Sequence, residues 1–177
     1  MEVTSTQKSS VLNARFVEYV VERCVKDKGF AARLRRADNP ATEYQSWELL
    51  AAFAVVEQKH RRLPFATIAA AIARANIERN GDLALGRAIA ACYPEGRDSD
   101  QARARLRRLL ACDDLGELCR LLRPLFSLID SRVDQPLDYL RLLRQLRGFA
   151  FDAERIKAQW AQEFYGQPVT DVEEVQS

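Results

Sequence analysis

Histidine is almost absent from the sequence, with His60 as the single residue among 177. A metal site built from several histidines is therefore not expected, and a Ser-His-Asp or Cys-His catalytic arrangement would have to use this one side chain. His60 lies between Lys59 and the pair Arg61 and Arg62, near the expected C-terminal end of a helix. This basic setting favours a helix-terminal charge or a phosphate contact over a general base.

Cysteine is also scarce, and its four residues are at positions 24, 92, 112 and 119. None belongs to a Cys-x-x-Cys pair, so no zinc-binding pattern arises. We predict that all four are small buried residues of a protein in a reducing compartment. No metal or other cofactor is expected.

Glycine and proline are few, with 7 and 6 residues, which argues against collagen-like, linker-rich and mostly disordered chains. No glycine-rich phosphate loop and no nucleophile-elbow motif is present. The N-terminus, MEVTSTQKSS, lacks the pattern of a signal peptide, and the longest apolar run, 49–56, is too short to span a bilayer. We therefore expect a cytoplasmic protein that does not contact membranes.

Helical periodicity dominates what is present, and no convincing strand alternation occurs. Hydrophobic residues make up 47% and charged residues 29%, as in a globular protein that buries a core. We predict an all-α fold of about nine helices in two small packed helical bundles. The expected helices cover residues 10–28, 30–37, 42–59, 64–78, 83–92, 98–112, 114–130, 135–148 and 152–165, with Pro124 kinking or dividing the seventh.

The strongest break in the pattern is the segment Tyr93-Pro94-Glu95-Gly96-Arg97. We place a domain boundary there, which gives an N-terminal bundle at 1–94 and a C-terminal bundle at 95–166. The remainder, 167–177, is expected to be a disordered acidic tail.

Positive charge is mostly arginine, which supplies 22 of the 27 basic residues. Arginine presents a planar fork of donors suited to phosphate, although arginine-rich genomes give the same bias. The bases cluster: six against one acid in 23–36, and four arginines without an acid in 103–108. A third group, Arg141, Arg144 and Arg147, has the i, i+3, i+6 spacing of one helix stripe.

The arginines of 103–108 differ in their position on the expected helix. Arg107 and Arg108 point away from its apolar face, whereas Arg103 and Arg105 flank that face and could pair with an acid at the core edge. The run is either a phosphate-facing ridge or an ordinary solvated helix face. Because no aromatic residue is interleaved, phosphate contact is more natural here than base stacking.

Carboxylates offer little evidence for catalysis. Asp98 and Asp100 are spaced to share a divalent ion, as nuclease carboxylates do, but acids in the first turn of a helix explain them better. Trp47 and Trp160 lie on apolar helix faces and are interpreted as core or interface residues. Composition and spacing therefore favour a non-catalytic binding or scaffold protein.

Several ordered segments resemble the CasB family, the small subunit of the type I-E CRISPR surveillance complex, Cascade. They are GFAARLRRA (29–37) with Pro40, LGRAIA (85–90), ARLRRLL (104–110), LRPL (122–125), PLDY (136–139) with Leu142 and Leu143, and the closing residues Trp160, Ala161 and 164–166. The resemblance covers roughly residues 29–166. The helix before Gly29 and the acidic tail carry no motif of the family.

The resemblance implies a helical, non-enzymatic subunit for antiviral defence, built from two small bundles. In this family a pair of copies lies along the complex and contacts the large repeated subunits that hold the guide RNA. The implied partners are other Cascade subunits, a second copy of the chain, the guide RNA, and the target and displaced DNA strands. Basic surfaces contact these strands largely without sequence preference and help to stabilise the R-loop.

Matching the motifs points to Arg33, Arg35, Arg36, Arg87, Arg105 and Arg123 as nucleic-acid-binding residues, and general basic character adds Arg103, Arg107, Arg108, Arg141 and Arg144. The motif match predicts that Arg105 binds nucleic acid, whereas its position beside the apolar face of the helix indicates a structural role. Both interpretations stay open. Which strand each arginine contacts is open, as is the number of copies in the complex.

Three other functions compete with this one. A helical protein–protein adaptor would direct the arginine clusters toward acidic partners and bind no nucleic acid. A helix-turn-helix regulator needs a recognition helix after a tight turn, and none is clear. A nuclease would rest on Asp98 and Asp100 alone.

Overall fold

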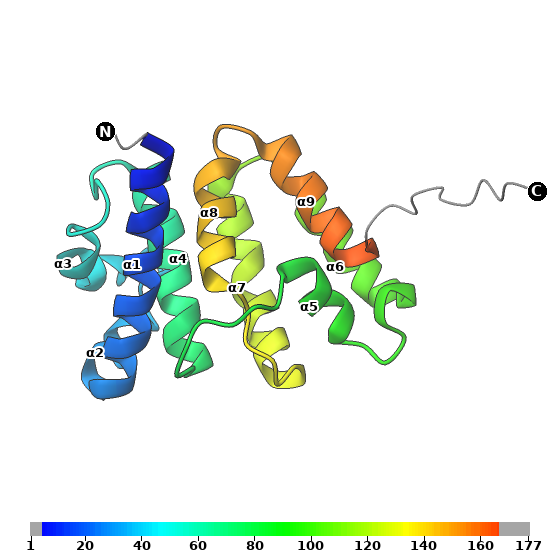
Figure 1. Cartoon of the computed structure of the whole chain (residues 1–177), viewed down its shortest axis with the longest axis horizontal. Coiled ribbons are helices and arrows are strands. Elements are labelled where there is room, and N and C mark those ends of the chain that lie inside the picture. Colours follow the sequence, from blue (N-terminus) through cyan, green and yellow to red (C-terminus); the bar gives the residue numbers. More distant parts are fainter. Residues whose placement is uncertain (1–4, 167–177) are drawn as a thin grey trace, which may run out of the picture.

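The computed structural model of the chain describes residues 5–166, and these form an all-α fold, as predicted (Figure 1). Within that range the elements are the α-helices α1 (Ser5–Lys26), α2 (Lys28–Leu34), α3 (Trp47–Leu50), α4 (Lys59–Ala75), α5 (Leu85–Ala91), α6 (Asp100–Leu110), α7 (Leu115–Arg132), α8 (Tyr139–Phe149) and α9 (Ala153–Tyr165), and the 3-10 helices η1 (Glu43–Ser46) and η2 (Gly96–Asp98). The expected disordered tail at 167–177 lies outside the described residues.

Helix α4 is the centre around which the N-terminal elements gather. It packs against α1 and α2 on one side and against α7 and α8 on the other (Figure 1). Every residue from Pro64 to Ala73 is buried, and five of these ten are alanine. Small side chains let the neighbouring helices approach closely. This explains how one helix can be covered on several sides.

The core continues from one end of the molecule to the other. In α1, Phe16 makes edge-to-face contacts with Phe53 and Phe65 at ring-centroid distances of 5.1 and 4.8 Å. At the opposite end, Phe149 of α8 stacks on the fully buried Trp160 of α9 at 6.2 Å. Such aromatic pairs add stability beyond the burial of their area.

Side-chain caps define where several helices begin. Asp114 accepts a hydrogen bond from the backbone N–H of Glu117 at 2.8 Å, and Asp152 accepts one from that of Arg155 at 3.2 Å. Both residues were predicted as helix starts, because a short acceptor satisfies the free N–H groups of the first turn. At α6, however, the cap is Ser99 rather than the predicted Asp98.

The helix predicted over 42–59 is wrong in its extent. The chain forms η1 and the single turn of α3, and then turns continue to residue 58. A long-range contact holds this shape: Arg62 donates from Nη1 to the carbonyl oxygen of Val56 and from Nη2 to Glu43, both at 2.9 Å. Helix α4 begins at Lys59. Pro64 was predicted to be its first residue but lies inside it.

Two further prolines were predicted to affect helix boundaries. Pro124 lies inside α7, which runs undivided to Arg132, so it does not divide the helix, and the kink stays a prediction. Pro136 does not open a helix, because the next residue, Leu137, forms an isolated parallel bridge with Leu83. Helix α8 starts only after Asp138, which caps it.

The packing crosses the boundary predicted at residue 94. Helix α5, which precedes the boundary, packs on α6 and α9, while α7 and α8, which follow it, pack on α4. The boundary itself stays a prediction.

Three of the four cysteines, Cys92, Cys112 and Cys119, are buried and Cys24 is partly buried; all four are free thiols. Burial raises the pKa of Cys24 and of Cys119 to about 11. No helix within residues 5–166 is long and apolar enough to cross a bilayer.

Candidate nucleic-acid interface

The arginines of the first motif lie at the end of α2. Arg33 and Arg36 are exposed, and no side-chain hydrogen bond or ion pair with another described residue holds either of them. Arg35 is also exposed, but its Nε donates to the backbone oxygen of Ala73 in α4 at 3.2 Å. The structure therefore leaves Arg33 and Arg36 available to a ligand and uses Arg35 to join two helices.

Asp38 brings Arg123 of α7 to the segment that follows α2. The Nε of Arg123 lies 3.8 Å from Oδ2 of Asp38, which also forms an ion pair with Arg74. Only 5% of the Asp38 side chain is exposed, compared with 48% of Arg123. Arg123 thus keeps about half of its side chain on the surface while its charge is partly balanced.

Arg103 and Arg105 both have partners within the protein. Arg103 donates from Nε to the carbonyl oxygen of Arg97 at 3.0 Å and forms an ion pair with Asp98 at 3.1 Å. Arg105 donates from Nε to the hydroxyl of Tyr93 at 2.6 Å. The position of these two arginines beside the apolar face predicted pairing with an acid, which Arg103 has. The partner of Arg105 is the hydroxyl of Tyr93 instead of an acid.

Asp98 and Asp100, which are spaced to share a divalent ion, have a common arginine neighbour in the structure. Both lie beside the guanidinium group of Arg103, at 3.1 and 3.8 Å. Across the part of the chain that the structure describes, no group of three or more His, Cys, Asp or Glu is placed to hold a metal ion.

Arg107 and Arg108 are exposed, as their helix position predicted. Arg108 and Arg105 line a cavity of about 430 Å³ between α6 and α7, together with Arg120. Glu117 and apolar residues complete the lining. Sequence reasoning missed Arg120, because its nearness to α6 depends on how two helices pack.

The remaining predicted residues lie on α5 and α8. Arg87 is exposed on α5. Arg144 donates to the hydroxyl of Ser10 at 3.0 Å. Arg141 forms an ion pair with Glu163 of α9 at 2.7 Å, although 47% of its side chain remains exposed.

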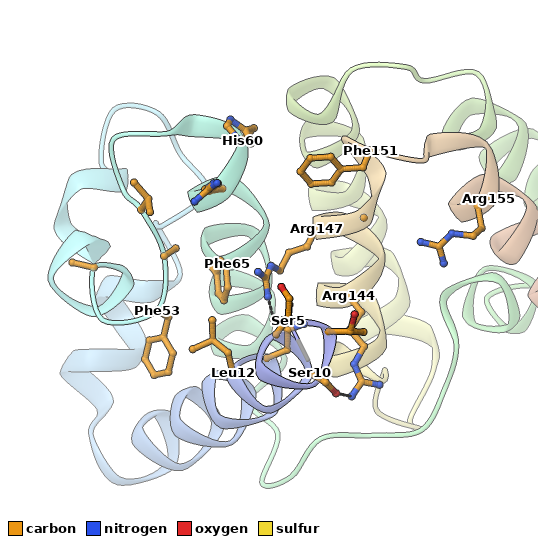
Figure 2. A pocket seen from close by; sticks show the side chains of 18 residues that line it. Ser5, Ser10, Leu12, Phe53, His60, Phe65, Arg144, Arg147, Phe151 and Arg155 are labelled. Carbon is orange, nitrogen blue, oxygen red and sulfur yellow. Dashed lines mark hydrogen bonds between the residues drawn. The ribbon is translucent and has the colours of Figure 1, made fainter. Parts of the chain in front are cut away.

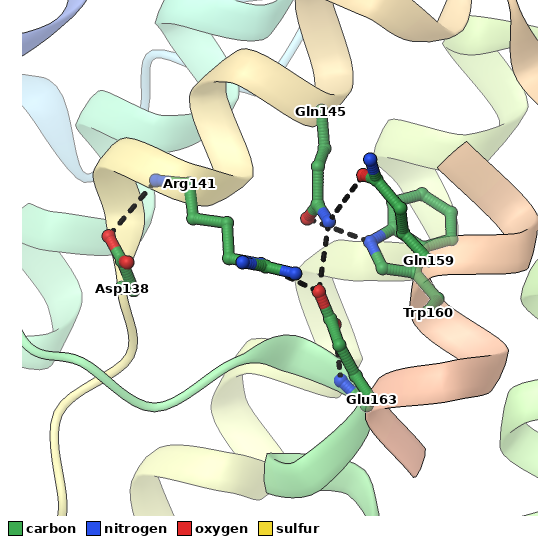
Figure 3. A network of polar contacts seen from close by, with 7 residues as sticks. Asp138, Arg141, Gln145, Gln159, Trp160 and Glu163 are labelled. Atoms are coloured by element: carbon green, nitrogen blue, oxygen red, sulfur yellow. Dashed lines mark hydrogen bonds and ion pairs between the residues drawn. The ribbon is translucent and has the colours of Figure 1, made fainter. Parts of the chain in front are cut away.

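Glu163 is the centre of a polar network that joins three helices (Figure 3). Besides Arg141, it accepts hydrogen bonds from Gln145 at 3.0 Å and from the backbone N–H of Gly86 at 3.1 Å. Gln145 in turn accepts from the indole N–H of Trp160 at 2.9 Å. This network fixes α5, α8 and α9 relative to one another and positions the arginine stripe of α8.

A larger cleft of about 1050 Å³ lies between α1, the start of α4 and the end of α8 (Figure 2). Four arginines line it: Arg61, Arg144, Arg147 and Arg155. Only Arg144 was among the predicted binding residues. The spacing of Arg141, Arg144 and Arg147 indicated the arginines that α8 contributes to this cleft. The arginine that α4 contributes depends on how α4 packs against α8, which helical periodicity does not show.

The fold and these surfaces define a class: an all-α protein whose arginines lie on several exposed helix faces and in two clefts. Residues 31–165 match the family described as CRISPR-associated protein Cse2, and the chain belongs to that family. The resemblance noted in the sequence is therefore confirmed, since CasB and Cse2 proteins share this fold.

Solved structures agree with this assignment. A chain of a CRISPR RNA-guided surveillance complex has a TM-score of 0.67 and 22% identity, over 89% of this chain and 92% of that one. A Cse2-family protein from Thermus thermophilus has a TM-score of 0.68 and 22% identity, over 88% and 98%. CasB from Thermobifida fusca has a TM-score of 0.67 and 20% identity, also over 88% and 98%. Comparison with curated proteins gives no match.

Proposed function

We propose that this chain is the non-catalytic small subunit of a type I-E CRISPR Cascade ribonucleoprotein. It contacts the guide RNA and the target and displaced DNA strands through arginine-rich surfaces, and so stabilises the R-loop. Its partners are the other Cascade subunits and a second copy of itself. Membership of the Cse2 family and a fold shared with a chain of a CRISPR surveillance complex support this proposal.

The observation that carries the nucleic-acid role is the set of exposed arginines without partners among the described residues. Arg33 on α2, Arg36 in the turn after α2, and Arg107 and Arg108 on α6 have this property. Leaving four guanidinium groups without carboxylates favours binding of an anionic ligand. In a guide-directed complex base pairing reads the sequence, so the protein needs only to neutralise phosphates.

The test is fluorescence anisotropy of a labelled random-sequence strand, RNA and DNA in turn, at increasing salt. We expect weak binding to both strands that fades steeply with salt. If these four arginines each neutralise one phosphate of a single strand, together they contribute roughly −3 to the log–log slope. The quadruple variant R33A/R36A/R107A/R108A should therefore reduce the slope by about this contribution.

A matched control removes four exposed bases elsewhere: Lys8, Arg15, Lys28 and Arg79. This variant has the same net charge as the first, so a slope that falls equally in both would contradict the assignment of the contact residues. No strand binding by the unmodified protein even at low salt would favour the protein–protein adaptor. Metal-dependent cleavage of the labelled strand would contradict a non-catalytic role.

A further inference from the structure

The charged residues that line the cleft between α1, α4 and α8 are all basic. They are Arg61, Arg144, Arg147 and Arg155, with His60 beside them, and the lining residues in the described part of the chain include no Asp or Glu. Ser and Thr residues from the first turns of α1 also line the cleft. A cleft lined by one sign of charge concentrates ligands of the other sign.

Two of these guanidinium groups lie close enough to affect each other. Partial burial lowers the pKa of Arg147, and the positive charge of Arg61 lowers that pKa further. Arg147 is held by the side-chain oxygen of Asn13 and by the ring of Phe65, whose centroid lies 5.1 Å from the guanidinium carbon. Both contacts are uncharged, so neither balances the charge of Arg147.

The other two arginines are also held at the cleft. Arg144 donates to Ser10 across from α8 at 3.0 Å, which fixes its guanidinium group without neutralising it. Arg155 forms an ion pair with Asp152 at 3.1 Å, so its charge is partly balanced. Three arginines of the cleft therefore lack a carboxylate partner among the described residues, and an anion in the cleft would supply one.

An aromatic ring lies at the same cleft. Phe151, in the connection between α8 and α9, is 84% exposed. Figure 2 shows its ring pointing from the end of α8 toward the start of α4. A single exposed phenylalanine is ordinary, but one beside three uncompensated arginines offers a flat apolar surface next to a phosphate-binding wall.

We infer that this cleft binds a single-stranded nucleic acid, with Arg61, Arg144 and Arg147 contacting successive phosphates and Phe151 stacking on a base. A volume of about 1050 Å³ suits a short stretch of strand better than one phosphate ion. A duplex keeps its bases stacked inside, so it cannot use Phe151 in the same way. The inference rests on the proposed function and adds to it the site and the kind of strand.

The test uses the full chain, a labelled oligothymidylate and a labelled blunt duplex of the same length, measured by anisotropy against salt. F151A should weaken single-strand binding about 5- to 150-fold, as expected for one stacked base. Its salt slope should not change, because stacking releases no counterions. Duplex binding by F151A should equal that of the unmodified protein.

R61A/R144A tests the phosphate contacts and avoids Arg147, which packs on Phe65. Its slope should fall by about 1.4, because each single-strand phosphate contact contributes about 0.7. Matched controls are K8A/R15A, which removes two exposed bases from other faces of α1, and Y44A, which removes another exposed aromatic ring. Both should bind like the unmodified protein, and circular dichroism should confirm that every variant is folded.

The outcomes separate this inference from the proposed function. If F151A and R61A/R144A bind like their controls while R33A/R36A/R107A/R108A loses slope, the inference is overturned and the proposed function stands. If the unmodified protein binds no strand at low salt, both are overturned. If R61A/R144A loses only binding to labelled poly-glutamate, the cleft takes an acidic polypeptide and the inference is overturned.

Discussion

Gly86 lies where α5 passes against α9. A Cβ atom at this position would meet the carbonyl oxygen of Trp160 at 2.4 Å and the backbone nitrogen of Phe164 at 2.6 Å. Backbone atoms of a packed helix cannot move away cheaply. The absence of a side chain at this residue is therefore what lets the two helices approach, and it keeps the Gly86 N–H within reach of Glu163.

The G86A variant should lower the free energy of unfolding by about 1–3 kcal/mol, which is the usual cost of overpacking. Chemical denaturation followed by circular dichroism measures the change. G148A is the matched control, because a Cβ there would meet no neighbouring atom closer than 3.5 Å. Replacing a helical glycine by alanine with room to spare should leave stability unchanged or raise it by up to about 1 kcal/mol. Equal destabilisation of both variants would contradict the close approach of α5 and α9.

At the scale of the elements, Glu163 holds α5, α8 and α9 together, and its side chain is only 6% exposed. E163A would leave the N–H of Gly86 and the amide of Gln145 without this acceptor. We expect a loss of about 2–3 kcal/mol in the free energy of unfolding, because hydrogen bonds to a buried charge are strong. E163Q, which keeps an acceptor oxygen, should lose less.

R141A is the comparison that separates the buried hydrogen bonds from the ion pair. The Arg141 side chain is 47% exposed, and exposed ion pairs contribute about 0–1 kcal/mol. The free energy of unfolding of R141A should therefore stay closer to that of the unmodified protein than the value for E163A does. The same denaturation curves measure both. A loss in R141A equal to that in E163A would place the stabilising contact in the ion pair instead.

Local rules predicted many of these elements but not how they meet. Asp114 and Asp152 start helices as expected, because a cap depends on residues three positions apart. The predicted extent of the helix over 42–59 was wrong, because the path of the chain there depends on a tertiary contact between Arg62 and Glu43. The same limit applies to the candidate site: the helix wheel predicted that Arg107 and Arg108 are exposed, but only the packing of α4 against α8 places Arg61 beside Arg147.

At the scale of the whole molecule, the two halves of the sequence do not separate in space. Helix α4 packs on α7 and α8, α1 packs on α8, and α5 packs on α9, so each half buries apolar surface of the other. Elements that complete one another's core unfold together. This arrangement predicts one cooperative unfolding transition, even if the segment at residues 93–97 bounds two bundles.

The two tryptophans make this prediction measurable. Trp47 lies in α3 and Trp160 in α9, so W47F leaves a reporter at one end of the molecule and W160F leaves one at the other. In each variant, urea unfolding followed by fluorescence should have the same midpoint as unfolding followed by circular dichroism, because both probes then report the same transition.

The W160F midpoint should be lower overall, since it loses the indole hydrogen bond to Gln145. Comparing probes within one variant removes this difference. A fluorescence midpoint that departs from circular dichroism in either variant would show that the two ends unfold independently, and would support a domain boundary near residue 94.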